Sequence, residues 1–574
     1  MRRWPIVLIV CALVAACSDR PPEPADLLLV NARVYTLSWP QPDAEGRPAT
    51  GAPHDGRTWH PDADAIAIRA GRIVFVGSRA DAERYRGAST AVRDLGGATV
   101  LPGLIDSHVH LAELGASLER VNLVGAATEE EVVSRVAARA REVPAGEWIV
   151  GWGWDEGAWA NRYPDMRLLN QRVPDHPVVL RGLHSFAVWG NRLAFERARI
   201  SAITPNPAGG EIRKDARGQP TGILLNNAGA LLMQAVPAPT PAQLDARLAA
   251  AFEALLAAGY VAVHEAGADT ELMAALERAE SQDRLPVRVY AMLAARDVDL
   301  IDRWRQRAPD TEGRLVVRSV KTFYDGAMGS RGALFLEDYS DRPGHRGLGG
   351  AEYGFDRQRL AFLMRRGYQI TIHAIGDRAN REALDFFGET IEQTPGAAAT
   401  RPRIEHAQVI SAPDLSRFAR LGVIASMQPS HAVEDLPWAE ARIGPGRLQG
   451  AYAWRTLRRA GARLALNSDL PGTDFNFFYG LHSAVTRQNR DREPSGGWRP
   501  DERLTIEEAI RGWTTWAAHT AFEDREAGVI ADGRSADLTV LDVDPFTTAD
   551  RDPSRLLTGR IAMTIAGGRI HAAR

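Results

Sequence analysis

The sequence predicts an α/β protein built around a TIM-type (β/α)8 barrel, and three observations support this prediction. The middle of the chain alternates short apolar runs with helix-like stretches, which is the pattern of parallel βα units. Eight such runs can be counted, and eight strands are the number that closes such a barrel. With 574 residues, of which 45% are hydrophobic, the chain is long enough for a barrel with added subdomains.

The eight predicted strands have apolar character and span residues 104–110, 260–265, 287–293, 316–323, 368–373, 403–406, 423–427 and 463–467. The gap between the first two strands, at 111–259, is much the longest. A bare loop of that length is uncommon in a compact domain. We therefore expect an inserted subdomain at about 113–255, which lies over the mouth of the barrel.

Both ends of the chain have β character. Runs with a strand pattern occupy residues 25–37, 65–77, 536–542 and 561–570. The stretch at 39–61 is rich in Pro, Gly and Asp, which predicts a loop. Two β-rich ends around a long middle predict one small sheet domain formed from 26–100 and 526–574, beside a barrel domain at 101–525.

Residues 1–17 have the pattern of a secretory signal peptide. Two arginines precede an apolar run that is too short to span a membrane. Because small residues come directly before Cys17, the segment resembles a bacterial lipoprotein signal, in which that cysteine is lipidated. Cleavage by ordinary signal peptidase, with Cys17 incidental, is the alternative. By the same resemblance, Ser18 after the cysteine favours the outer over the inner membrane. We therefore expect export to the bacterial cell envelope and a lipid anchor that is the only membrane contact. Residues 18–25 would form the tether.

The charge balance argues against a nucleic-acid partner. The formal net charge is -3, and the 69 basic residues give no cationic excess over the 72 acidic ones. The hydrophobic and charged fractions, 45% and 25%, are those of a globular protein and exclude disordered and polytopic membrane classes. A small molecule is therefore the expected partner, and the sequence is compatible with a homo-oligomer.

Four histidines and one aspartate end predicted barrel strands. His108 and His110 alternate at the end of the first strand, which puts both imidazoles on one face. His373, His406 and Asp469 end or follow three later strands. Because the carboxyl ends of barrel strands share one mouth, we expect these side chains to meet. Neutral imidazole with carboxylate suits zinc and similar divalent ions, so the pattern predicts a site for one or two of them.

Lys321 lies near the end of the fourth predicted strand. The chain has only two lysines, Lys214 and Lys321, although it has 69 basic residues. A lysine on an apolar strand therefore indicates chemistry that arginine cannot perform. A neutral lysine amine can react with carbon dioxide to form a carbamate that bridges two metal ions. The alternative is a buried lysine paired with Asp325.

Several motifs together resemble the amidohydrolase superfamily. They are residues 101–110, 320–331, 373–378, 404–408 and 468–469, together with 536–542. Within the superfamily the chain is similar to the branch typified by N-substituted formamide deformylase. The resemblance covers nearly the whole chain from Ala25 and implies a TIM barrel beside a small β-sandwich made from both termini.

The resemblance also implies a ligand set. One metal would be held by His108, His110, carboxylated Lys321 and Asp469, and a second by Lys321, His373 and His406. A bound metal lowers the pKa of water and polarises the scissile carbonyl. Asp469 would act as general base and then as general acid. If only one metal binds, the role of Asp469 is unchanged and Lys321 is structural.

Other histidines have weaker support. His431 resembles a substrate contact of the family, at the mouth of the barrel. His264 ends the second strand and either faces the site or caps the strand. His184 lies in the insertion and is expected to contact substrate, although members of the family often have Asp-Gly-His where this chain has Gly182-Leu183-His184.

The insertion is rich in tryptophan between residues 148 and 159. We expect some of these side chains in the core of the subdomain and one or two, such as Trp154, in the substrate pocket. They indicate an apolar or aromatic group on the substrate. Asp325 and Asp377 are expected to orient neighbouring ligands.

The sequence thus predicts a metal-dependent hydrolase that cleaves a carbon–nitrogen bond other than a peptide bond, in an amide or N-acyl group. A cyclic amide, a deaminated ring or a small ester are alternative substrates for the same fold. An alternative of another class is an envelope lipoprotein that binds a small ligand without turnover.

Overall fold

The computed structural model describes residues 22–154, 163–182, 187–207 and 209–573. At its centre is a parallel eight-stranded sheet in the order β20-β19-β18-β17-β16-β15-β14-β7. The strands are β7 (Leu104–Val109), β14 (Tyr260–Ala268), β15 (Arg288–Ala294), β16 (Leu315–Phe323), β17 (Gln369–Ala374), β18 (Arg403–His406), β19 (Ile424–Met427) and β20 (Arg463–Leu466). All eight predicted strands are present, and the predicted barrel is confirmed.

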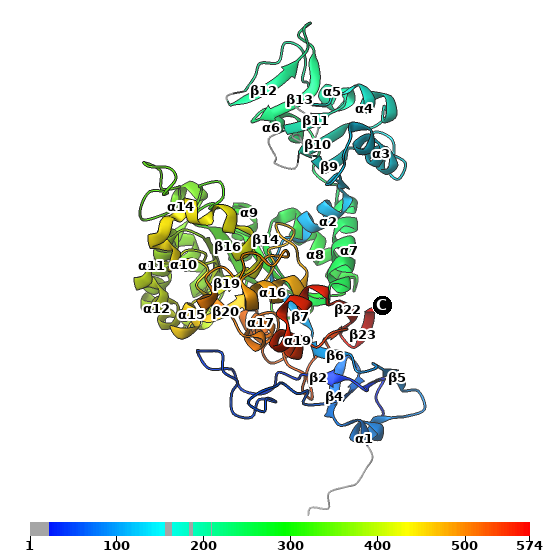
Figure 1. The fold of residues 1–574 in the computed structure, drawn as a ribbon, viewed down its shortest axis with the longest axis vertical. Helices are drawn as coiled ribbons and strands as arrows, with labels where there is room; N and C mark the ends of the chain where they lie inside the picture. Colours follow the sequence, from blue (N-terminus) through cyan, green and yellow to red (C-terminus); the bar gives the residue numbers. More distant parts are fainter. Residues whose placement is uncertain (1–21, 155–162, 183–186, 208, 574) are drawn as a thin grey trace, which may run out of the picture.

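Helices surround this sheet, as the alternating pattern predicts (Figure 1). They are α2 (Leu111–Glu119), α7 (Pro241–Ala257), α8 (Thr270–Ser281), α9 (Val298–Trp304), α10 (Arg357–Arg365), α11 (Asp377–Gln393), α12 (Ala412–Leu421), α13 (Pro429–Glu434), α14 (Leu436–Leu448), α15 (Trp454–Arg459), α16 (Phe477–Thr486), α17 (Ile506–Gly512) and α18 (Thr515–Thr520). Since helices cover the outside and side chains fill the inside, β7, β17, β18 and β19 are buried throughout.

The barrel closes where β7 meets the turn after β20. Val109 and Leu470 form an isolated parallel bridge. The His110 N–H donates to the carbonyl of Leu470 at 3.0 Å, and the Asp469 N–H donates to the carbonyl of His108 at 3.1 Å. Both hydrogen bonds involve residues of the predicted metal site, so the closure of the barrel positions that site.

Both termini build two small sheets that pack together as a β-sandwich, which confirms the predicted fold class. The elements are β1 (Leu27–Val30), β2 (Arg33–Val34), β3 (Ala65–Arg69), β4 (Arg72–Gly77), α1 (Arg79–Ala82), β5 (Ala91–Asp94), β6 (Thr99–Pro102), β21 (Leu538–Leu541), α19 (Pro545–Arg551), β22 (Ile561–Ala566) and β23 (Arg569–Ala573). In the five-stranded sheet, β6 of the N-terminal part pairs with β21 of the C-terminal part. Leu29, Ile66 and Leu538 contribute to their shared core.

The insertion folds around a six-stranded sheet in the order β12-β13-β11-β10-β9-β8. Its elements are β8 (Val121–Asn122), α3 (Glu129–Ala140), β9 (Ile149–Trp154), α4 (Arg167–Arg172), β10 (Val178–Gly182), β11 (Ala187–Gly190), α5 (Arg192–Arg197), β12 (Gly210–Lys214), β13 (Pro220–Asn226) and α6 (Gly229–Met233). The helices α2 and α7 connect this lobe to the barrel (Figure 1). A Cβ atom at Gly115 of α2 would lie only 2.3 Å from the Arg247 carbonyl oxygen of α7, so glycine permits their close approach.

The position of the insertion differs from the prediction. Figure 1 shows its sheet and the helices packed on it as a lobe apart from the barrel, and no described residue of β8 to α6 lines the cavities at the barrel mouth; within 113–255 only Glu113, on the connecting helix α2, does. The physical reason is that it buries its apolar side chains in two cores of its own, one around Trp154 and Trp189 and one around Phe195.

Across the described ranges, no helix has the length and apolar character needed to span a bilayer.

Candidate functional site

Six polar side chains from the ends of five strands meet at the carboxyl end of the barrel. They are His108, His110, Lys321, His373, His406 and Asp469. All of them line one cavity with a volume of about 430 Å³. The structure therefore brings together every residue that the sequence predicts as a metal ligand.

Asp469 lies against the two histidines of β7. Its Oδ1 atom is 3.4 Å from His108 Nε2 and 3.3 Å from His110 Nε2. The Nζ atom of Lys321 is 3.5 Å from His108 Nε2, and the lysine is only 2% exposed. Burial lowers the pKa of Lys321 to about 8, which raises the fraction of neutral amine at neutral pH.

Hydrogen bonds behind the site fix which nitrogen of each histidine faces the cavity. His108 Nδ1 donates to Glu405 Oε2 at 2.6 Å, and His406 Nδ1 donates to Gln428 Oε1 at 3.0 Å. With its proton on Nδ1, each imidazole directs the Nε2 lone pair toward the cavity. Burial lowers the pKa of His108 to about 4 and that of His406 to about 3, so both are neutral, as metal ligands must be.

A buried ionic network supports Glu405. Arg403 Nη2 forms an ion pair with Glu405 Oε1 at 2.8 Å, and both side chains are fully buried. The Arg403 guanidinium also donates to the Ser107 carbonyl oxygen at 2.8 Å. Burial raises the pKa of Glu405, but the charge of Arg403 and the hydrogen bond from His108 outweigh burial and hold it well below its usual range. Glu405 is therefore ionised and anchors His108.

The donor set fits a divalent metal. One nitrogen of His108, one of His406 and one oxygen of Asp469 lie within 4.8 Å of one another. His373 Nε2 is buried and has no hydrogen-bond partner in the described part of the chain. A buried polar atom without a partner is unfavourable, and a metal ion would satisfy it. Neutral imidazoles, a carboxylate and an amine able to form a carbamate suit zinc and similar ions.

The backbone at the site is strained. His406 has φ 70°, Ala407 has φ 43° and Asp469 has φ 58°, all in the left-handed region. Such conformations cost about 1–3 kcal/mol each for residues other than glycine, and they concentrate at functional sites. At Asp469 the closing hydrogen bond to His108 holds this conformation and directs the carboxylate toward the histidines.

A second cavity adjoins the first. Its volume is about 620 Å³, and it shares His110, Lys321 and Phe323 with the first. Glu265 lies in its wall and accepts the Leu111 N–H at 2.7 Å. Burial raises the pKa of Glu265 to about 7. The site therefore has room for a substrate that extends to both sides of the donor set.

Sequence reasoning missed Glu405, Arg403, Gln428 and Glu265. Each lies within a strand or directly after one, and Glu405 and Glu265 are direct neighbours of the predicted site residues His406 and His264. The available signal was the presence of charged side chains inside short strands that are otherwise apolar, since buried charges require partners.

Two predicted substrate contacts are contradicted. His264 is buried inside the barrel, 3.1 Å from Arg403 Nη1, and lines neither mouth cavity. Its neighbour Glu265 reaches the mouth instead, because successive side chains of a strand point in opposite directions. Trp154 is fully buried in the core of the insertion, where its indole donates to the Leu180 carbonyl oxygen. It lines neither mouth cavity.

Of the remaining predicted residues, one lines the first cavity, two accept backbone hydrogen bonds near it, and two lie outside the described residues. His431 lines the first cavity, with Nε2 3.9 Å from Asp469 Oδ2. Asp325 accepts the N–H groups of Leu334, Ile375 and Gly376, and its Oδ1 lies 3.7 Å from His373 Nε2. Asp377 accepts the Leu336 N–H and forms no described hydrogen bond or ion pair with a predicted ligand, so it holds a loop and does not orient a ligand. His184 and Cys17 lie outside the described residues.

Comparison with known proteins identifies the family. A sequence profile of the amidohydrolase family matches residues 91–572. The chain belongs to the amidohydrolase family. It is 32% identical to the Bacillus subtilis amidohydrolase YtcJ over 88% of this chain and 95% of that protein. It is 28% identical to the N-substituted formamide deformylase of Arthrobacter pascens over 91% of this chain and 94% of the relative.

Solved structures agree with this assignment. An uncharacterized metal-dependent hydrolase from Pyrococcus furiosus is similar, with a TM-score of 0.72 and 28% identity over 91% of this chain and 99% of that chain. The resemblance predicted from the motifs is therefore confirmed, and the protein is a hydrolase of the amidohydrolase family whose site carries a donor set for a divalent metal.

The Glu405 network generates a testable prediction. Glu405→Gln keeps an oxygen for His108 but removes the charge that balances buried Arg403. We expect metal affinity to fall roughly 10-fold to 100-fold, and the free energy of unfolding to fall by about 3–5 kcal/mol. Competition with a chelator and urea denaturation measure the two effects. Glu392→Gln, at an exposed position on α11, is the matched control; an unchanged metal affinity in Glu405→Gln would contradict the anchoring role.

Proposed function

We propose that this amidohydrolase cleaves a non-peptide carbon–nitrogen bond, in an amide or N-acyl group, by means of water activated at a divalent metal centre. The observation that carries the proposal is the position of the Asp469 carboxylate, within 3.4 Å of two histidine nitrogens at an open cavity. The relative named N-substituted formamide deformylase supports this bond class.

In this proposal, one metal would be held by His108, His110, carboxylated Lys321 and Asp469, and a second would be held by Lys321, His373 and His406. When bound, the metal lowers the pKa of water and polarises the carbonyl of the substrate. Carboxylation of Lys321 forms a bond between its Nζ and the carbon of carbon dioxide and releases one proton. The burial of Lys321 and its lowered pKa favour the neutral amine that this step requires.

Asp469 moves the proton. Burial raises the pKa of Asp469, but the nearby histidines outweigh burial and hold it well below the usual range. The carboxylate is therefore ionised and free to accept a proton from the attacking water. It then passes that proton to the leaving amine nitrogen, so the general base becomes the general acid.

Apolar side chains around the donor set fit the expected substrate. Phe323, Met328 and Trp438 line the first cavity, and Phe323 also lines the second. These side chains, and not Trp154, support the inference that the substrate carries an apolar or aromatic group. His431, on α13, lines the same cavity and is placed to contact the substrate.

The proposal extends to the location of the protein. The signal pattern at residues 1–17 favours export to the bacterial cell envelope with a lipid anchor at Cys17, in the outer membrane. The tether at 18–25 would then connect the anchor to the β-sandwich.

The proton-transfer role is tested at Asp469. Wild-type protein should release free amine from members of a panel of N-substituted formamides and N-acyl amines. Asp469→Asn should lower kcat by roughly 100-fold to 10,000-fold, because the amide cannot accept the proton. Asp501→Asn, at an exposed position, is the matched control and should be fully active. Near-normal turnover in Asp469→Asn with a normal far-ultraviolet spectrum would rule out the assigned role.

The carboxylated lysine is tested independently of turnover. Isotopically labelled bicarbonate should give one lysine carbamate signal in the NMR spectrum of the metal-loaded protein. Lys321→Ala should remove the signal, whereas Lys214→Ala should retain it. The comparison is clean because these are the only two lysines of the chain, and Lys214 is exposed in the insertion. A signal that survives Lys321→Ala, or no signal in the wild type, would contradict the proposal that carboxylated Lys321 holds both metals.

A further inference from the structure

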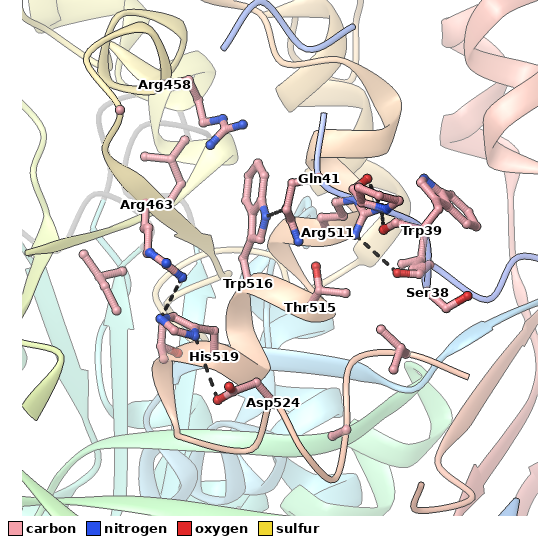
Figure 2. Close-up of a pocket in the computed structure, with 18 residues that line it drawn as sticks. Ser38, Trp39, Gln41, Arg458, Arg463, Arg511, Thr515, Trp516, His519 and Asp524 are labelled. Carbon is pink, nitrogen blue, oxygen red and sulfur yellow. Dashed lines mark hydrogen bonds and ion pairs between the residues drawn. The ribbon is translucent and has the colours of Figure 1, made fainter. Parts of the chain in front are cut away.

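A third cavity lies at the opposite end of the barrel from the donor set. Its volume is about 500 Å³, within the range of small-molecule sites. The first residues of β19 and β20, Ile424 and Arg463, line it, which places it at the amino ends of the strands. Helices α15, α17 and α18 and the N-terminal segment 37–41 form the rest of its wall (Figure 2).

The cavity has one uncompensated cation. Arg463 has no carboxylate partner among the described residues, and its Nη1 donates to His519 Nε2 at 3.0 Å. Burial and the charges of Arg401 and Arg463 lower the pKa of His519 to about 4, so the imidazole is neutral and balances no charge. Asp524 also lines the cavity; it pairs with Arg401 at 2.7 Å and lies 3.9 Å from His519 Nδ1 (Figure 2).

The other two arginines of the cavity are already paired. Arg458 lies 3.3 Å from Glu508, and Arg511 lies 2.9 Å from Glu507. Arg511 also donates to carbonyl oxygens of the N-terminal segment, including that of Trp39 at 3.0 Å. Arg511 thus attaches the segment to the barrel, and both arginines have carboxylate partners, which leaves Arg463 as the group able to bind an anion.

The rest of the wall is largely apolar. The indole N–H of Trp516 donates to Gln41, and that of Trp39 donates to Glu507. Both rings line the cavity, and the Arg458 guanidinium lies over the Trp516 ring, 4.8 Å from its centroid. Figure 2 shows the Trp516 ring between Arg463 and the N-terminal segment. Leu464 extends the apolar wall beside Arg463.

We infer that this cavity is a second ligand site, separate from the hydrolytic centre, which binds a small carboxylate that carries a ring or a short apolar chain. The carboxylate pairs with the Arg463 guanidinium, whose planar fork matches it in a bidentate arrangement. The apolar part packs against the Trp516 ring. The metal-donor cluster found among the described residues, His108, His406 and Asp469, belongs to the other end of the barrel, so this site is assigned to binding.

The test compares two probes of similar shape. Phenylacetate and phenylacetone, a neutral ketone that a hydrolase cannot cleave, are titrated into the full-length holoenzyme by calorimetry. Phenylacetate should bind at least roughly tenfold more tightly than phenylacetone, because only the former pairs with Arg463. Arg463→Gln should abolish this preference without a change in the thermal unfolding midpoint, since Arg463 is exposed.

Arg420→Gln, an exposed position on α12, controls for the loss of one surface charge and should bind as the wild type does. Binding of phenylacetate in the hydrolytic centre would be insensitive to Arg463→Gln, because that residue lies at the other end of the barrel. Equal affinity of wild type and Arg463→Gln, or no measurable binding of phenylacetate in the millimolar range, would overturn the inference.

Discussion

The hydrogen bonds between β7 and the turn after β20 are the constraint on which the site depends. They close the barrel, and the residues that make them, His108, His110 and Asp469, belong to the donor set. A change in the register of this closure would move the carboxylate away from both imidazoles at once. The left-handed backbone of Asp469 is the local strain that this arrangement requires. Fold and chemistry are therefore coupled at one seam of the barrel, while the β-sandwich and the insertion lie outside it.

The electrostatic design follows from burial. The barrel interior holds His108, His406 and Lys321 in a medium where charge is unfavourable, so the imidazoles are neutral and the pKa of the amine is lowered. Glu405 remains ionised there because Arg403 balances it. The result is a pair of neutral imidazoles, one of them anchored by a buried ion pair, beside a lysine of lowered pKa and the ionised Asp469 carboxylate. This arrangement explains how the same residues can bind a cation and transfer a proton.

Most of the barrel and the donor set could be predicted from the sequence, because strand periodicity and strand order together determine which polar residues meet at the mouth. The hydrogen-bond partners that hold the donor set from behind could not be predicted. Glu405 precedes His406 in a strand of four residues, and only the structure shows that it reaches His108. The side that His264 faces depends on strand geometry that the apolar pattern does not reveal. Trp154 and the position of the insertion depend on tertiary packing, which aromatic composition alone does not determine.

Metal content per chain tests the central claim most directly. Protein produced without the first 17 residues and purified without chelators should contain about two divalent ions per chain by elemental analysis, and removal of these ions should abolish turnover in a way that zinc or a similar ion restores. About one ion per chain would be compatible with a hydrolase in which Lys321 has only a structural role. A protein that binds no divalent metal, even after reconstitution, or that turns over substrate without any, would contradict the account.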